Sequence, residues 1–199
     1  MVLSNVEIVK ALESGVFKIN GLLARDPSER PFNASAVDLR LGNEIVIPKC
    51  DHPIQLDLRR GGIARFWAQN SEKLKIREDN PFSLTPNRFV LANTLETVEF
   101  PIHPEGRQCY SARIEGKSSL ARCGILVHFT APTIHAGYGG PITLEMINLG
   151  TVDFLLIPGM AICQLIIEEV KGSPTEAPNQ FKGQINAVGE VPPEEPAKA

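Results

Sequence analysis

Apolar residues recur at every second position over most of the chain, which is the period of a β-strand with one buried face. We expect a hairpin turn at Gly42-Asn43, two strands rather than one between residues 89 and 100, and an exposed loop over 59–71. The runs that predict strands are 37–41, 45–47, 54–58, 74–76, 82–84, 89–100, 110–114, 125–130, 142–148, 152–157 and 161–170.

One stretch near the N-terminus has the helical period instead. Its apolar residues are Val6, Val9 and Leu12. Ser4 and Glu7 have the spacing of a capping box, and Gly15 is a natural stop signal. The pattern predicts a helix at about 5–14 that serves packing or assembly, without a catalytic group.

The composition favours a β-rich domain followed by a tail. The 16 glycines and 16 prolines, with few aromatic residues, are typical of many short strands and turns. After residue 171 the chain is rich in proline and glutamate and has little to bury. We therefore predict one mainly β, antiparallel domain with an N-terminal helix over 1–171. A flexible C-terminal arm follows over 172–199 and is disordered toward its end.

Charge and cysteine usage exclude several classes of protein. A formal net charge of −3 gives no bulk basic field for nucleic acid. The four cysteines form no C-x-x-C pair, so neither a disulfide framework nor a cysteine zinc site is expected, and a cytoplasmic location follows. Charged residues occupy the place of a signal peptide, and no apolar stretch reaches the ~20 residues that cross a bilayer.

Residues 115–122, Glu-Gly-Lys-Ser-Ser-Leu-Ala-Arg, have the composition of a phosphate grip. The Gly-Lys-Ser part matches the end of a P-loop, but the first glycine of that motif is missing, so a true P-loop is not expected. Ser118 or Ser119 can cap a helical turn here. The freed amides, with Lys117 and Arg122, would then hold phosphate oxygens. An ordinary capped turn with solvated cations explains the residues equally well.

The run 142–148 carries one carboxylate among apolar residues. On a strand, one face would carry Ile142, Leu144 and Met146, and the other Thr143, Glu145 and Ile147. If both faces are covered, Glu145 is a buried acid of the kind that takes and gives a proton near neutral pH. An exposed strand residue or a paired structural ion is the alternative interpretation.

The four histidines form no zinc motif, so metal-activated water is not expected. His128 lies in an alternating run and is interpreted as a satisfied core or interface residue. His135 lies in the turn-rich loop 130–140 and is the histidine that we expect near a ligand. Nucleophilic catalysis has little support, because no cysteine or serine has a base beside it in the sequence.

Taken together, these segments resemble the dCTP deaminase family, whose signature usually reads (D/E)-G-R-S-S-L-A-R-x-G, as in residues 115–124. The resemblance covers the chain to about residue 188. Further matching segments are 3–19, 35–42, 127–131, 134–140, Leu144-Glu145-x-x-Asn148, 158–160 and Gln164.

The resemblance implies a fold, an assembly and a reaction. The fold would be the distorted antiparallel β-barrel of trimeric dUTPases, and the homotrimer would have its active sites between subunits. The reaction would convert dCTP and water to dUTP and ammonia without zinc, with Mg²⁺ carried on the substrate triphosphate. No metal site on the protein and no membrane partner are implied, and dTTP is a candidate inhibitor.

Residue roles follow from the positions that match. Glu145 would deprotonate water and shuttle the proton, while Ser118 and Arg122 would fix the water and the phosphates. Lys117 replaces the family's arginine, which keeps the charge but loses the bidentate fork. The remaining substrate-binding residues would be Ser119 in the phosphate grip, Thr130 and Ala131 at the base edge, His135, Tyr138 on the deoxyribose, and Lys182 and Gln184 in the arm that closes over the site around 181–184.

The chain also departs from the family pattern. His135-Ala136 replaces the Asp-Pro that supports attack on the phosphate chain in dUTPases and bifunctional enzymes, which argues against diphosphatase activity. Thr133 and Gln180-Phe181 replace an arginine and a Lys-Tyr pair. We therefore expect a dCTP deaminase that feeds dUTP to thymidylate synthesis. The alternatives are a dUTP diphosphatase or bifunctional deaminase-diphosphatase, and a non-catalytic nucleotide-binding trimer.

Overall fold

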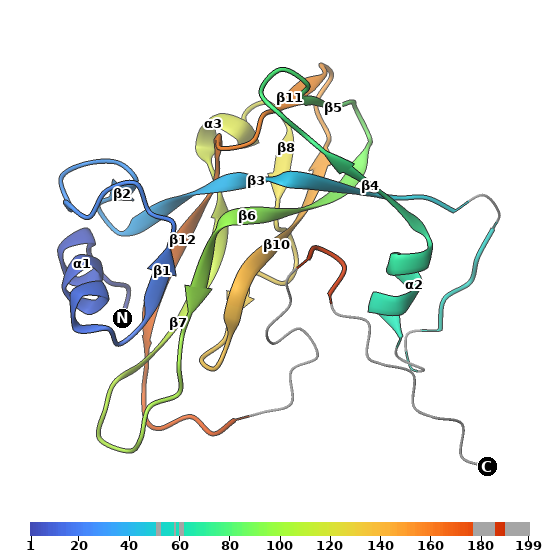
Figure 1. Ribbon diagram of the computed structural model, residues 1–199. Helices are drawn as coiled ribbons and strands as arrows, with labels where there is room; N and C mark the ends of the chain where they lie inside the picture. Colours follow the sequence, from blue (N-terminus) through green and yellow to red (C-terminus); the bar gives the residue numbers. More distant parts are fainter. Residues whose placement is uncertain (51–52, 58, 60–61, 177–185, 190–199) are drawn as a thin grey trace, which may run out of the picture.

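The computed structural model describes residues 1–50, 53–57, 59, 62–176 and 186–189. Its strands form a curled antiparallel sheet, with the N-terminal helix α1 (Asn5–Ser14) beside it (Figure 1). Ser4 accepts a hydrogen bond from the amide of Glu7 at 3.3 Å, and Gly15 ends the helix in the left-handed region at φ 69°. The predicted helix, its N-cap and its stop are therefore confirmed.

Ten strands form the main sheet, in the order β8-β10-β6-β3-β12-β7-β9, with β1 on β6 and both β2 and β4 on β3. Every pairing among the described residues is antiparallel, which confirms the predicted fold class. The strands are β1 (Lys18–Asn20), β2 (Phe32–Asn33), β3 (Ala36–Pro48), β4 (Ser71–Lys75), β6 (Phe89–Glu99), β7 (Cys109–Gly116), β8 (Ile125–Val127), β9 (Thr133–Ile134), β10 (Gly139–Asn148) and β12 (Ala161–Val170).

A second sheet of two strands, β5 (Phe82–Leu84) and β11 (Phe154–Leu156), completes the β structure. Two short helices, α2 (Ile63–Gln69) and α3 (Ser118–Ala121), lie in the connections. The longest helix in the described part of the chain is α1, with ten residues, and no described helix is long and apolar enough to cross a bilayer.

The hairpin predicted at Gly42-Asn43 is wrong, because β3 continues through it for 13 residues. Its register against β6 shifts between Leu41 and Ile45, so the irregularity is a bulge rather than a turn. A Cβ atom at Gly42 would lie 2.9 Å from the carbonyl oxygen of Asn93. Gly42 therefore allows a close approach of two backbones and does not reverse the chain.

The two strands predicted between residues 89 and 100 are also wrong, since β6 is one strand. Its polar residues are satisfied inside the sheet rather than placed in a turn. The hydroxyl of Thr94 donates to the carbonyl of Glu96 at 2.7 Å and accepts from the amide of Ile142 at 2.9 Å. Buried polar groups with partners do not interrupt a strand.

The segment around residues 54–71 differs from the prediction as well. Ile54 and Leu56 are 38% and 41% exposed and belong to no strand, whereas the predicted loop contains α2. The rings of Phe66 and Trp67 stack edge to face at 5.0 Å, and Trp67 packs on the apolar cluster of Val46, Leu91, Ala187 and Val188. Ala187 and Val188 are 5% and 6% exposed, so this part of the predicted tail is buried.

Candidate functional site

Glu145 lies in the middle of β10, where burial alternates from residue to residue. Leu144 and Met146 are fully buried in the core, and the Glu145 side chain is 32% exposed on the opposite face. Across the sheet Glu145 is opposite Leu91 of β6, so the two side chains share a face. The predicted alternation is confirmed, and the carboxylate is half-buried rather than enclosed.

One oxygen of the Glu145 carboxylate, Oε2, lies close to the buried side chain of His128. His128 Nδ1 lies 2.8 Å from Glu145 Oε2, but the angles are not those of a hydrogen bond. Among the described residues, neither ring nitrogen of His128 nor Glu145 Oε2 has a hydrogen-bond partner. These atoms are buried without a hydrogen-bond partner, so the interpretation of His128 as a satisfied residue is wrong.

The backbone fixes His128 in this position. Its amide donates to the carbonyl of Glu145 at 2.7 Å, and its φ of 55° lies in the left-handed region that side chains seldom adopt. Such strain often accompanies a functional position. No local pattern indicates this contact, because it depends on the pairing of β8 with β10.

The proposed phosphate grip forms the short helix α3. Ser118, Ser119 and Arg122 are all exposed on it. The N-cap residue is Lys117, whose carbonyl accepts from the amides of Leu120 and Ala121 at 3.0 and 2.9 Å. No side chain caps the helix, so the predicted capping by Ser118 or Ser119 is wrong. The helical turn itself is present, with its polar groups facing outward.

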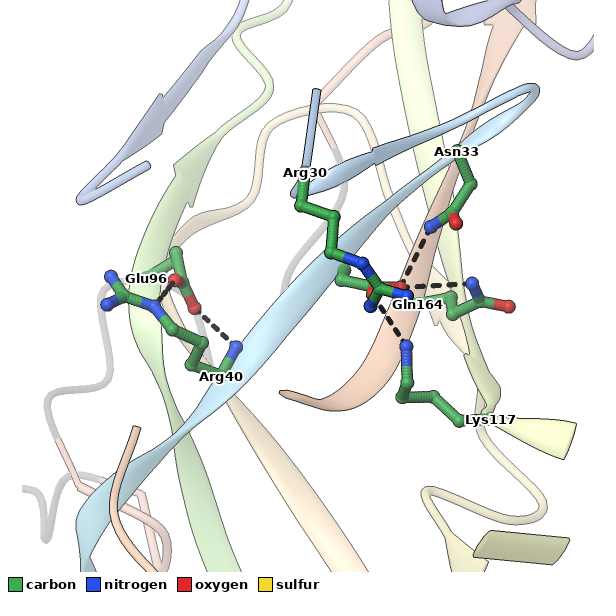
Figure 2. Close-up of polar contacts among 7 residues, drawn as sticks. Arg30, Asn33, Arg40, Glu96, Lys117 and Gln164 are labelled. Atoms are coloured by element: carbon green, nitrogen blue, oxygen red, sulfur yellow. Dashed lines mark hydrogen bonds and ion pairs between the residues drawn. The ribbon is translucent and has the colours of Figure 1, made fainter. Parts of the chain in front are cut away.

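Lys117 is engaged with a buried carboxylate behind this turn (Figure 2). Its Nζ donates to Asp38 Oδ2 at 2.6 Å, and Asp38 Oδ1 accepts from Asn33 and Gln164 at 2.9 and 3.0 Å. The exposed guanidinium of Arg30 lies 3.6 Å from Asp38 Oδ2. The residue predicted to bind a phosphate is thus an ion-pair partner with its side chain only 17% exposed.

The environment keeps Asp38 ionised. Burial pushes the pKa of Asp38 upward, but the hydrogen bonds from Lys117, Gln164 and Asn33, with the charge of Lys117, outweigh it and hold that pKa below its usual range. A buried carboxylate with several donors is stable as an anion. Lys117 therefore meets a full negative charge.

The turn-rich loop contributes residues of two kinds. Thr130, Ala131 and His135 are exposed, and Thr130 has a φ of 89°. Tyr138 is only 8% exposed, and its hydroxyl donates to the carbonyl of Pro141 at 2.5 Å. The loop therefore exposes Thr130 and His135 to solvent, while the tyrosine ring is buried and its hydroxyl is bound to the backbone.

A pocket of about 410 Å³ lies beside Tyr138. It contains two acidic side chains, Glu99 and Glu176, and Glu99 pairs with Lys18 at 2.8 Å. This charge disfavours phosphate, so the pocket is a poor candidate for the triphosphate site. The predicted arm residues Lys182 and Gln184 lie outside the described residues.

The phosphate grip and the acid belong to different elements. Ser118 lies in α3 and Arg122 directly follows it, in the connection to β8, whose Ile125 is opposite Asn148 of β10. Glu145 is three positions back along β10, a distance of about 10 Å at the usual rise of a strand. In Figure 1, α3 lies beside β8. The structure therefore places Glu145 against His128, and Ser118 and Arg122 at the exposed turn of α3.

Among the described residues, no group of three or more histidine, cysteine, aspartate or glutamate side chains could hold a metal ion.

Comparisons with known proteins show the family to which this chain is similar. A family model for dCTP deaminase-like proteins matches residues 2–170. The chain is 38% identical over 178 residues to the dUMP-forming dCTP deaminase of Dictyoglomus thermophilum, covering 89% of this chain and 84% of that protein. It is also 38% identical over 195 residues to the dCTP deaminase of Natronomonas pharaonis, covering 92% and 91%.

One solved structure supports the fold. It is the 2′-deoxycytidine 5′-triphosphate deaminase of Agrobacterium tumefaciens, which superimposes with a TM-score of 0.61 at 17% identity. The match covers 85% of this chain and 48% of that chain, so this chain spans about half of the larger protein.

Proposed function

The chain belongs to the dCTP deaminase-like family, and from this premise we propose that it is a hydrolase that converts dCTP and water to dUTP and ammonia. The observation that carries the proposal is the half-buried carboxylate of Glu145 with one oxygen against His128. It lies on a strand face whose opposite side is sealed by the core, which holds the acid rigidly. A fixed acid and base of this kind is what hydrolytic deamination requires.

In the proposed mechanism Glu145 takes a proton from water, and the resulting hydroxide adds to C4 of cytosine. The same carboxylate delivers that proton to N3, which gives a tetrahedral intermediate. A second proton moves from the added hydroxyl to the 4-amino group through Glu145, and ammonia leaves. The atoms balance as dCTP plus water to dUTP plus ammonia. His128, whose ring lies against Oε2, would support the step through this contact.

The phosphate chain would be held by Ser118, Ser119 and Arg122, which are exposed on α3. Thr130, Ala131 and His135 would contact the base and sugar, and the arm residues Lys182 and Gln184 would close over them. In this proposal Mg²⁺ neutralises the triphosphate and arrives on it, since no donor cluster is found among the described residues. We place the enzyme in the cytoplasm, in keeping with its four unpaired cysteines.

We further propose that the site is shared between subunits of a homotrimer, as the resemblance to the dCTP deaminase family implies. Mixing two inactive variants tests this. Glu145→Gln and Arg122→Ala would be co-refolded in equal amounts, and a shared site then draws each half at random. About one quarter of the sites would be intact, with about one quarter of the wild-type activity. A mixture that stays inactive would place both residues in one chain's site.

The reaction itself is tested by incubating the protein with dCTP and Mg²⁺ and measuring ammonia and nucleotide products. We expect dUTP and ammonia in equal amounts, and a loss of at least about 100-fold in kcat for Glu145→Gln. The absence of both products would refute the proposal.

A second candidate is a bifunctional enzyme that also releases pyrophosphate and leaves dUMP. It is favoured by the identity to the dUMP-forming enzyme of Dictyoglomus thermophilum. Against it, His135 offers no carboxylate at the position that the resemblance assigns to attack on the phosphate chain. The same assay decides between the two candidates, because dUTP and dUMP separate by charge.

A further inference from the structure

A buried carboxylate with its hydrogen-bonding capacity filled stands behind the α3 turn. Asp38 is 4% exposed and receives donors from two other parts of the sheet, Asn33 of β2 and Gln164 directly opposite on β12. Its third donor is Lys117, 79 positions away in the sequence. Since β2, β3 and β12 together fix Asp38, the Lys117 ammonium is tied to the main sheet.

The backbone of Lys117 opens the turn that carries the ligand-facing residues. Its carbonyl accepts the first two hydrogen bonds of α3, while its side chain points back to Asp38 (Figure 2). A helix of four residues has little stability of its own. Its direction therefore depends on how its first residue is held, and the ion pair with Asp38 holds it.

The charges argue against Lys117 as a simple phosphate ligand. A phosphate would have to displace a carboxylate at 2.6 Å from an ammonium that is only 17% exposed. Arg122, in contrast, is exposed at the end of the turn. The pair is thus better suited to positioning than to direct binding.

We propose that Asp38 is a positioning residue: through Lys117 it holds α3 in the orientation in which Ser118 and Arg122 bind the phosphate chain of the nucleotide. This inference rests on the proposed function, because it names the part of the substrate that the turn serves. Asp38 itself touches no reacting atom.

The direction in which Asp38→Asn changes dCTP affinity distinguishes a positioning role of Asp38 from a purely electrostatic one. Asp38→Asn removes a negative charge near the phosphates and frees Lys117. If Lys117 were a direct ligand held back by competition, dCTP would bind more tightly. If Asp38 positions the turn, dCTP binds more weakly, because an amide offers one acceptor oxygen where three donors converge.

The test uses the full chain with Glu145→Gln to stop turnover, and titrates dCTP and dCMP with Mg²⁺ by calorimetry. We expect Asp38→Asn to raise the Kd of dCTP about tenfold and that of dCMP less than about threefold, since the longer phosphate chain depends more on the turn. Lys117→Gln should behave in the same way. Lys117→Arg should restore dCTP binding to within about threefold of the parent, because it keeps the ion pair.

A matched control is available in a second buried ion pair, which Arg40 of the same strand β3 makes with Glu96 of β6. Glu96 is 1% exposed and pairs with Arg40 at 2.6 Å, so Glu96→Gln also disrupts a buried ion pair but leaves α3 alone (Figure 2). It should lower Tm without changing the ratio of the two Kd values. Three results would overturn the inference. They are the same change of the Kd ratio in Glu96→Gln, an equal loss of affinity for dCTP and dCMP in Asp38→Asn, and tighter binding of dCTP in Asp38→Asn.

Three further cases are distinguished. If Asp38→Asn does not fold, Lys117→Gln carries the test, because Asp38 keeps Asn33 and Gln164 as donors and Arg30 nearby. If the wild-type protein releases no ammonia from dCTP, the proposed function falls and the inference falls with it. If the wild-type protein is active but the ratio of the dCTP and dCMP Kd values is unchanged in the variants, the inference is overturned and the proposed function stands.

Discussion

The Asn148 side chain joins three backbone segments at the end of β10, so the cost of replacing it by aspartate can be worked out from the structure. Asn148 is fully buried, and its Nδ2 donates to the carbonyls of Leu84 and Val152 at 2.8 Å each. Its Oδ1 accepts from the amide of Gly150 at 2.8 Å. Asn148→Asp keeps the shape and the bond from Gly150, but turns both donated bonds into contacts between oxygens.

The magnitude follows from these contacts. Two net hydrogen bonds are worth about 2–3 kcal/mol, and leaving two buried carbonyls against a carboxylate adds roughly 2 kcal/mol or more. We therefore expect Asn148→Asp to lower the free energy of unfolding by at least about 4 kcal/mol at pH 7. For a chain of this size, Tm would fall by about 8 to 16 °C. A matched control is Asn43→Asp, which makes the same change at an exposed position and should cost less than about 0.5 kcal/mol.

The assay is urea unfolding followed by circular dichroism between pH 7 and pH 4. Burial raises the folded-state pKa of the new carboxyl above its unfolded value, so the folded variant binds the additional proton more readily than the unfolded chain. The penalty is therefore full at high pH and shrinks as the pH falls through that folded-state value. A loss below about 1 kcal/mol, or a difference from wild type that is the same at both ends of the pH range, would refute the reasoning.

Three other predictions follow from single contacts. Gly124→Ala should lower the free energy of unfolding, measured by chemical denaturation, by about 3 kcal/mol, because φ is +84° at this position and an added Cβ would clash with the amide of Gly150. The matched control Gly15→Ala also has a positive φ but lies in open space, so it should lower that free energy by only about 1–2 kcal/mol. The pKa of Asp38 lies below its ordinary 3.8 in the folded state, so its stabilisation is complete above about pH 5 and is lost as the pH falls below 3.8; the gap in unfolding free energy between wild type and Asp38→Asn should narrow from pH 7 to pH 3. His128→Asn suits a φ of 55° and removes the ring, so kcat for dCTP should fall about tenfold with Tm within about 3 °C; an unchanged kcat would show that the contact with the catalytic carboxylate has no role.

The sequence predicts the parts of the fold that depend on local pattern. The cap and the stop of helix α1 are residues next to the helix in the sequence. The alternating faces of β10 follow from the two-residue period of its apolar positions. Gly42 was misread because its role depends on Asn93, which is distant in the sequence. For α2, the spacing of Ile63, Phe66 and Trp67 is helical and could have revealed the helix despite the glycines before it.

The site was predictable only as far as its chemistry is visible in residue types. Glu145 stands out as a lone acid on an apolar strand, but its contact with His128 requires the pairing of two strands. The partner of Lys117 is 79 positions away, and no local motif indicates Asp38 as a buried anion. Long-range ion pairs of this kind follow from the topology, which the local pattern does not determine.

The ten-residue signature from Glu115 to Gly124 combines chemistry with anchoring. Lys117 fixes the start of α3 to the sheet through Asp38, and Gly124 fixes its end, because its carbonyl accepts from the amide of Leu149 at 2.8 Å and its Cα lies against Gly150. The turn is therefore held at both ends by contacts that no ligand needs to touch. A chain that carried the serines and Arg122 without these two anchors would have the groups for phosphate binding but not their geometry, and a misplacement of about 1 Å is enough to lose most of the binding and rate that the signature is expected to provide.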